Sequence, residues 1–135
     1  MNAIKTALAQ LEAAAAAKKL SASAVENIRT WLNQPYLRDY APLVAEHLAA
    51  EKWRELEDAF WTTIPFGTGG RRGRMYPIGC NAINDRTIGE SAQGLADYVK
   101  KQAAGGVAKP VACGNPRRGL SCAIAYDTRH RSRQF

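Results

Sequence analysis

The residues whose types best suit ligand binding or catalysis lie in one short loop. Residues 66–74 read Phe-Gly-Thr-Gly-Gly-Arg-Arg-Gly-Arg, with four glycines and three arginines in nine positions. Glycine lets the backbone approach a ligand closely, so that successive N–H groups converge on an anion. Arginine adds a planar fork of donors that matches phosphate oxygens, and the hydroxyl of Thr68 adds another donor. This glycine–arginine loop therefore predicts an anion site; a tight turn with solvated arginines is the alternative that composition alone leaves open.

The loop differs from two common phosphate-binding motifs. No Gly-Lys-Ser/Thr follows it, which excludes a Walker A sequence. Residues 67–72 run Gly-Thr-Gly-Gly-Arg-Arg, so the last glycine of a GxGxxG pattern falls one place late. The loop therefore does not point to a particular nucleotide.

A second candidate site is Asp127-Thr128-Arg129, which follows the apolar run Leu120–Tyr126. Ligands of open α/β sheets gather beyond the carboxyl ends of the strands. If 120–126 is a buried strand, Asp127 can brace an arginine and Arg129 can reach a phosphate. The alternative is a helix N-cap followed by a surface charge.

The elements that must position these residues change in character along the chain. Residues 1–60 predict helices, with an apolar stripe at Ile4, Leu8, Leu11 and Ala15. A second helix is expected to begin at a Ser23-x-x-Glu26 capping box, a third to cover 41–50, and a fourth, continuous with the third or separate from it, to cover 51–61.

Beyond Pro65 the sequence predicts shorter elements around one long helix. Residues 75–84 favour a short strand or hairpin, and Asn84-Asp85 leads into a helix that Thr87-x-x-Glu90 can cap. Ile88, Ala92, Leu95 and Val99 place an apolar stripe on that helix, which Gly105-Gly106 ends.

Charge divides the chain in the same place. The net charge is +7, yet residues 1–60 hold seven Lys and Arg against eight Asp and Glu, and residues 61–135 hold twelve against four. The second half therefore favours an anionic partner such as phosphate, nucleic acid or anionic lipid, and a uniformly basic, histone-like chain is excluded.

Other classes of protein fit the sequence poorly. No apolar run approaches the roughly 20 residues that span a bilayer, and the N-terminus lacks the pattern of a secretory signal. Three widely spaced cysteines, Cys80, Cys113 and Cys122, form no CxxC pair. We therefore expect reduced thiols, a cytoplasmic location, no membrane partner and no metal ligands.

Three ordered motifs carry a resemblance to a known family. They are FGTGGRRG at 66–73, INDRTIGESAQGLADYVKKQ at 83–102 and AIAYDTRHRSRQF at 123–135. Residues 55–135 resemble the opening of the α-D-phosphohexomutases, the phosphoglucomutase/phosphomannomutase family. That family shows F-G-T-[AS]-G-[LI]-R-G, then N-D-x-T-I and Q-G-L-A-x-Y, then a strand that ends in D-T-R.

The resemblance implies a fold and an activity. The fold class would be α/β, with residues 61–135 forming the N-terminal part of an incomplete three-layer α/β/α first domain. Residues 1–60 would be a helical N-terminal extension. Members of the family interconvert hexose 1- and 6-phosphates by intramolecular phosphate transfer, through a phosphoserine and a bisphosphorylated intermediate, with Mg²⁺ at the serine.

The resemblance also assigns roles to individual residues. Arg72 matches the loop arginine that contacts the phosphoserine or the bisphosphate, which makes it the catalytic candidate. Thr68, Gly69, Gly70 and Arg72 are the substrate-binding candidates, and Arg129 joins them. Arg71 stands where the family has Leu or Ile, so its side chain is expected either to face solvent or to make a second phosphate contact.

Other active-site motifs of the family do not occur in these 135 residues. They include the T-A-S-H-N-P-like serine loop, the D-x-D-x-D-R metal loop and the G-E-x-S-G sugar loop. Mg²⁺ is thus implied by the resemblance, but its ligands are not in the chain. We expect an N-terminal fragment of a phosphoglucomutase- or phosphomannomutase-type enzyme that binds hexose phosphate or bisphosphate, is inactive alone and self-associates through unburied apolar faces.

The alternative is a stand-alone basic module that binds anions or RNA through the glycine–arginine loop. The basic second half favours it. However, no aromatic residues alternate with the arginines, as they do in many single-strand binders, so nucleic acid is the weaker expectation. An interaction protein built on the alanine-rich helices is a third reading.

Overall fold

A computed structural model describes residues 2–104. This part of the chain is mostly helical and contains one two-stranded sheet. Its elements are α1 (Asn2–Ala16), α2 (Ala22–Asn33), the 3₁₀ helix η1 (Pro35–Leu37), α3 (Ala41–Ala49), α4 (Trp53–Phe60), β1 (Phe66–Gly67), β2 (Gly70–Arg71) and α5 (Asp85–Ala104). The chain divides into two compact units, residues 1–87 and 88–135.

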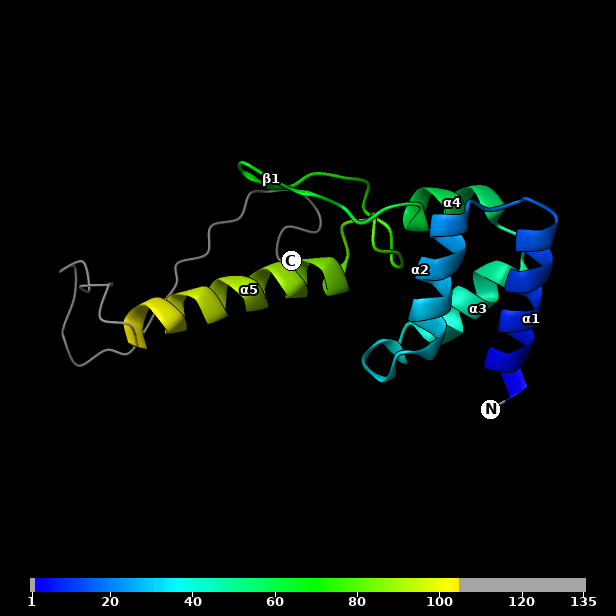
Figure 1. The fold of residues 1–135 in the computed structure, drawn as a ribbon, viewed down its shortest axis with the longest axis horizontal. Helices are drawn as coiled ribbons and strands as arrows, with labels where there is room; N and C mark the ends of the chain where they lie inside the picture. The colour runs from blue at the N-terminus through cyan, green and yellow to red at the C-terminus, as the bar shows by residue number, and fades with distance from the viewer. Residues whose placement is uncertain (1, 105–135) are drawn as a thin grey trace. The chain divides into compact units, whose positions relative to one another are not determined.

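Helices α1 to α4 pack around one apolar core. Helices α1 and α2 lie side by side, α3 packs against both, and α4 contacts α2 and α3 (Figure 1). The largest apolar side chains that this core buries completely come from all four helices and from the segment before α5: Leu11, Ile28, Val44, Leu48, Leu56, Phe60 and Ile78. Burying each such side chain contributes roughly 1.5–3 kcal/mol, so apolar packing is the main stabilisation of this unit.

The buried face of α1 differs slightly from the predicted stripe. Ala7, Leu11 and Ala14 are buried, whereas Ile4 is 37% exposed. Small alanine side chains let neighbouring helices approach closely, because the distance between helix axes depends on the side chains at the contact. Leu8 and Ala15 of the predicted stripe are half-buried against the same core, so the stripe is confirmed except at Ile4.

The first residue of α2 also differs from the prediction. The N-cap is Ser21, whose Oγ accepts a hydrogen bond from the Ala24 backbone N–H at 3.2 Å. Ser23 lies inside the first turn, with its hydroxyl 3.2 Å from that of Ser21. Ser21 and Ser23 both suit the start of a helix, and the sequence alone did not separate them.

Helices α3 and α4 are separate. Residues 50–52 connect them, and Glu51 adopts φ 50°, which no α-helix contains. The sequence left a continuous helix open, because neither glycine nor proline marks this position. The break turns α4 back onto α2 and α3.

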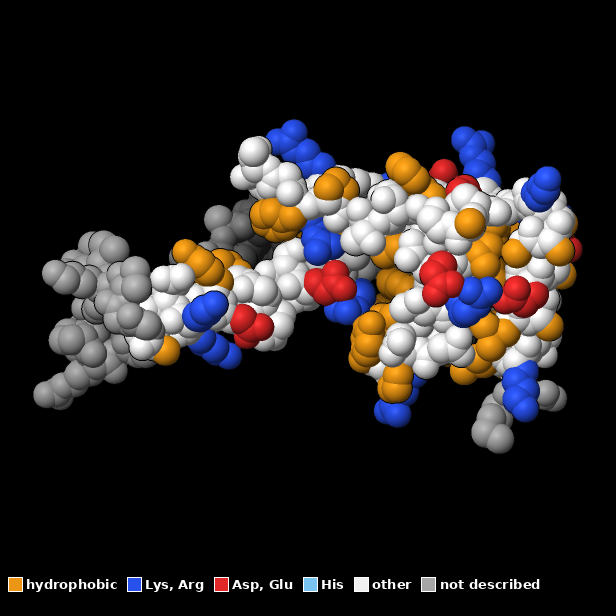
Figure 2. Space-filling view, viewed as in Figure 1, with side chains coloured by type: hydrophobic (Ala, Val, Ile, Leu, Met, Phe, Trp, Pro, Cys, Tyr) orange, Lys and Arg blue, Asp and Glu red, His pale blue; other side chains and the backbone are white. Residues whose placement is uncertain are grey.

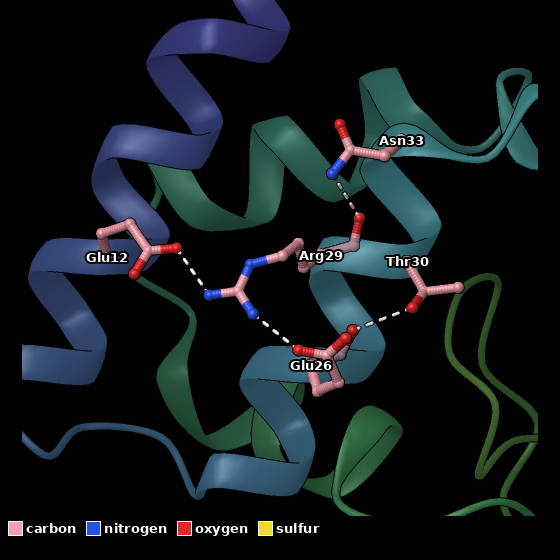
Figure 3. A network of polar contacts seen from close by, with 5 residues as sticks. All are labelled: Glu12, Glu26, Arg29, Thr30 and Asn33. Carbon is pink, nitrogen blue, oxygen red and sulfur yellow. Dashed lines mark hydrogen bonds and ion pairs between the residues drawn. The ribbon is translucent and has the colours of Figure 1, made fainter.

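Charged side chains join the first two helices at the surface. Arg29 of α2 lies 2.7 Å from Glu12 of α1 and 2.6 Å from Glu26 of its own helix (Figure 3). These two carboxylates, Glu12 foremost, raise the pKa of Arg29. Acidic and basic side chains are mixed over these helices on the face drawn in Figure 2. The helical surface thus shows both signs of charge, in agreement with the near-neutral balance of residues 1–60.

The segment between α4 and α5 contains few regular elements. Where a strand or hairpin was expected over 75–84, a single parallel bridge joins Met75 and Ile83. The start of α5 is capped by Asn84, whose Oδ1 accepts from the Thr87 N–H at 3.0 Å, while Thr87 Oγ accepts from the Asn84 N–H. The sequence predicted Thr87 as the N-cap residue. In the structure Asn84 is the N-cap residue, and Thr87 is the residue three positions later that completes the capping box.

Helix α5 is described as far as Ala104, and the Gly105-Gly106 stop predicted for it lies outside the described residues. Along its expected apolar stripe, Ala92, Leu95 and Val99 are exposed and Ile88 is half-buried. Self-association through such a face stays a prediction.

The described residues are compatible with an α/β class, but they do not form a three-layer α/β/α sandwich. The expected strand at 120–126 lies outside them, as does Arg129. The division between an extension at 1–60 and a domain at 61–135 rests on sequence and stays a prediction. No helix within residues 2–104 has both the length and the apolar character needed to cross a membrane.

Candidate functional site

The glycine–arginine loop begins with a tight hairpin. Strands β1 and β2 pair antiparallel, with Phe66 opposite Arg71 and Gly67 opposite Gly70, so Thr68 and Gly69 form a two-residue turn. Gly70 adopts φ 116°, a region that side-chain-bearing residues rarely enter. The glycine that the sequence supplies here is therefore required by the backbone.

The hairpin encloses a small hollow of about 190 Å³. We call it the glycine hollow. Its walls are Pro65, Gly67, Thr68, Gly69, Gly70 and Arg72. All four substrate-binding candidates of the described chain, Thr68, Gly69, Gly70 and Arg72, thus line one concave surface. Thr68, Gly69 and Arg72 are exposed and Gly70 is half-buried, so a hydroxyl, a guanidinium and glycine backbone lie within reach of a small anion.

The three arginines of the loop point to different places. Arg72 is exposed and lines the glycine hollow, whereas Arg71 is half-buried and is not among the residues that line it. Arg74 lies against α4, with its Nη1 3.9 Å from Asp58 Oδ2 and its guanidinium 4.8 Å from the ring centre of Tyr76. The sequence grouped these side chains as one cluster, but only Arg72 is placed to meet an anion in the hollow.

Backbone hydrogen bonds join the two ends of the segment that carries the loop and attach this segment to α4. The Ile64 N–H donates to the Cys80 carbonyl at 2.8 Å, and the Asn81 N–H donates to the Ala59 carbonyl at 2.9 Å. Gly79 adopts φ 103° so close to α4 that a Cβ there would lie 2.3 Å from the Ala59 oxygen. The loop is therefore an exposed segment, held by backbone hydrogen bonds on both sides, at Ile64 and at Asn81.

A buried histidine and a tyrosine provide a further attachment. His47 of α3 is 5% exposed; its Nδ1 lies 2.7 Å from the Leu43 carbonyl and its Nε2 lies 2.8 Å from the Tyr76 hydroxyl. A carbonyl oxygen only accepts, so Nδ1 carries the proton, and in the neutral ring Nε2 accepts from Tyr76. Burial, together with the charge of Glu55, raises the pKa of Tyr76, while Arg74 opposes the shift.

Sequence reasoning missed this pair. Tyr76 and His47 are 29 positions apart, so no local pattern in the sequence joins them. One feature of the sequence could have predicted a buried histidine: His47 falls on the same helix face as the apolar Val44 and Leu48. A buried imidazole ring needs hydrogen-bond partners.

A ligand set for Mg²⁺ is absent from the described part of the chain. Within residues 2–104, no three His, Cys, Asp or Glu side chains gather where they could hold a metal ion. The described residues therefore do not fit the metal that the resemblance implies. The Cys80 thiol donates to the Thr62 carbonyl at 3.1 Å.

Comparison with known proteins links part of the chain to a sugar-phosphate enzyme. Phosphoribomutase of Saccharomyces cerevisiae is 34% identical over 79 residues, which cover 56% of this chain and 12% of that protein. The chain therefore spans a small part of the relative it matches. No family model matches the chain, and no solved structure matches it. The likeness supports a link to the mutases over part of the sequence.

Proposed function

We propose that the glycine–arginine loop binds the phosphate group of a phosphorylated sugar, as one part of a mutase-type phosphotransferase. The observation that carries the proposal is the glycine hollow, in which Thr68, Gly69, Gly70 and Arg72 meet. The partial likeness to a phosphoribomutase supports the same class of reaction.

The chemistry asked of the loop is positioning and charge stabilisation. A transferring phosphoryl group carries negative charge on its oxygens, and most of its catalysis consists of holding it in line and neutralising that charge. The guanidinium of Arg72 donates two parallel hydrogen bonds to such oxygens, and the Thr68 hydroxyl donates a third. In this proposal Arg72 contacts the phosphate and the three-layer α/β/α domain of the family supports the loop.

The proposed substrates are sugar monophosphates. The sequence resemblance favours hexose phosphates and the related enzyme's name indicates a ribose phosphate, so both belong in the test. The polypeptide of residues 1–135 contains no segment that resembles the family's serine loop. We therefore expect these 135 residues to bind a sugar phosphate without converting it.

Calorimetric titration of the purified chain tests the proposal. Glucose 1-phosphate and ribose 1-phosphate should bind, and Arg72→Ala should weaken binding by about tenfold or more, since a hydrogen bond to a charged group contributes about 1.5–3 kcal/mol. Arg38→Ala is the matched control, because Arg38 is exposed and lies outside the loop. Equal losses in the two variants, or mutase turnover by the chain alone, would contradict the proposal.

The basic second half also favours an RNA-binding module. RNA affinity that falls steeply with salt and is lost in Arg72→Ala, with no sugar phosphate bound, would support that function instead.

A further inference from the structure

A second cavity, of about 290 Å³, lies between α4 and residues 73–82, which include the last two residues of the glycine–arginine loop. Its walls are Glu55, Asp58, Ala59, Trp61, Gly73, Arg74, Tyr76, Asn81 and Ala82. We call it the α4 cavity. It shares no wall residue with the glycine hollow, so what it binds is independent of the proposed phosphate site.

The charged groups of the α4 cavity include both signs. Glu55 and Asp58 lie three residues apart on α4, which places both carboxylates on one face of the helix. The guanidinium of Arg74 faces them, 3.9 Å from Asp58, and it also covers the ring of Tyr76. The place that a cation would occupy, over an aromatic ring and beside a carboxylate, is therefore already filled by the protein itself.

The remaining polar atoms are available to a ligand. The carboxylate of Glu55 makes no hydrogen bond or ion pair within residues 2–104, although its charge raises the pKa of Tyr76. Arg74 and Asp58 are more than half exposed, and their separation is long for a direct ion pair. The α4 cavity thus offers a ligand hydrogen-bond acceptors, the carboxylates of α4, and hydrogen-bond donors, the guanidinium N–H groups of Arg74.

One wall of the α4 cavity is aromatic and open. Trp61, the residue after α4, lines the cavity and is 52% exposed. An indole combines a flat apolar face with one N–H donor, a combination common where a ligand has both an apolar and a polar side.

These features select a class of ligand. An anion would meet two carboxylates, a cation would compete with Arg74, and an apolar molecule would leave the charged groups without solvent. A neutral polyhydroxylated ring satisfies all of them: its hydroxyls donate to carboxylates and accept from a guanidinium, while its C–H face covers an indole. We propose that the α4 cavity is a binding site for a neutral saccharide, with Glu55, Asp58 and Arg74 contacting the hydroxyls and Trp61 the ring.

The volume agrees with a ligand of this size. Small-molecule sites usually measure about 300–1,000 Å³, so the α4 cavity lies at the lower end and suits a single sugar ring. Because hydroxyls exchange water for protein partners on binding, we expect weak affinity, with Kd of about 1–10 mM.

Nuclear magnetic resonance of the full chain tests the proposal. Methyl α-D-glucoside and methyl α-D-mannoside, both uncharged, are titrated while the indole N–H signals are followed. The Trp61 signal should shift with saturation for at least one glycoside, whereas the signal of buried Trp31 should not move. Arginine amide and inorganic phosphate, which represent a cation and an anion, should leave the Trp61 signal unchanged.

Two kinds of variant separate binding from folding. Glu55→Gln with Asp58→Asn keeps the shapes of both side chains and should weaken glycoside binding about tenfold or more. Arg72→Ala, outside the α4 cavity, should not change it. No saturable shift with either glycoside, or a shift that persists in the double variant, would overturn the proposal, as would stronger binding of arginine amide or phosphate.

Discussion

The helices and the glycine–arginine loop use the same residue types in opposite ways. Phe60, at the end of α4, is 0% exposed and packs edge-to-face on Trp31 at 5.4 Å, whereas Phe66, in β1, is 67% exposed. Arg29 has two carboxylate partners between helices, whereas Arg72 lines an open hollow. Side chains in the helices stabilise the fold, and those in the loop remain accessible to a ligand.

Within residues 2–87, the helices supply the stability and the glycine–arginine loop carries the proposed binding site. Apolar packing of α1 to α4 forms a base, and the segment that carries the loop is attached to that base at Tyr76 and Asn81. A scaffold that positions exposed loop residues is a common arrangement for binding sites. Changes in the base should therefore alter the free energy of unfolding, and changes at the loop tip should not.

The two phenylalanines give the largest expected contrast. Phe60→Ala removes a fully buried ring and should lower the free energy of unfolding by about 3–5 kcal/mol, because it leaves a cavity in the core. Phe66→Ala should change it by no more than about 0.5 kcal/mol. Urea unfolding followed by circular dichroism measures both.

Because Phe60→Ala can remove most of the free energy of unfolding of a small domain, Phe60→Leu is the second, less disruptive variant. It should remain folded and lie between the wild type and Phe60→Ala. Similar losses at Phe60 and Phe66 would show that β1 is part of the core after all.

Two glycines provide the next contrast. Gly79→Ala should cost about 2–4 kcal/mol, because its positive φ and the Ala59 oxygen at 2.3 Å from the new Cβ combine strain with overpacking. At Gly69 a Cβ has no neighbour within 4 Å, so Gly69→Ala should be close to neutral. Thermal unfolding of both variants is the measurement. A Gly69→Ala loss as large as that of Gly79→Ala would mean that the loop tip is structurally constrained.

The attachment at Tyr76 gives a smaller effect and a dependence on pH. Tyr76→Phe should cost about 1–2 kcal/mol, since it leaves buried His47 without its partner on Nε2. Because the pKa of Tyr76 is raised by folding, the unfolded chain ionises first, and this contribution to stability is present below about pH 10 and falls as the pH rises further.

Urea unfolding at about pH 8 and about pH 10.5 tests this dependence, and Tyr76→Phe should lose less stability between the two pH values than the wild type does. Tyr36→Phe, at an exposed ring, is the control. An unchanged alkaline slope in Tyr76→Phe would contradict the assigned burial.

The ion pairs of Arg29 give the smallest effect. Arg29→Met should lower the melting temperature slightly at low salt and not measurably at high salt, because exposed charges are screened. Melting curves at the two salt concentrations decide this. A large, salt-independent loss would show that Arg29 packs as part of the core.

The sequence predicted features that depend on residues close together in the chain, and it missed those that depend on contacts between separate elements. Helices at α1, α2, α3, α4 and α5 followed from local periodicity. The glycines and Thr68 of the hollow are neighbours in sequence, so their meeting was also predictable. The Ser21 cap, the break at Glu51 and the pairing of His47 with Tyr76 were not, because each is decided by contacts between elements.

The separation of Arg74 from Arg72 shows the same limit within a single loop. Spacing alone could not reveal that Arg74 is drawn to Asp58 and the Tyr76 ring, because both partners take their positions only when α4 and the loop are folded together. Arg129 and the strand expected before it lie outside the described residues, so that half of the predicted site stays a prediction.

The central claim is that the glycine hollow binds a phosphate group through Arg72. The most direct measurement follows the backbone amide signals of the full chain while inorganic phosphate is added at constant ionic strength. The amides of Thr68, Gly69 and Gly70 should shift with saturation, and Arg72→Ala should abolish the shifts while Arg74→Ala leaves them largely intact. Unmoved amides at these three residues, or shifts that persist without Arg72, would contradict the claim.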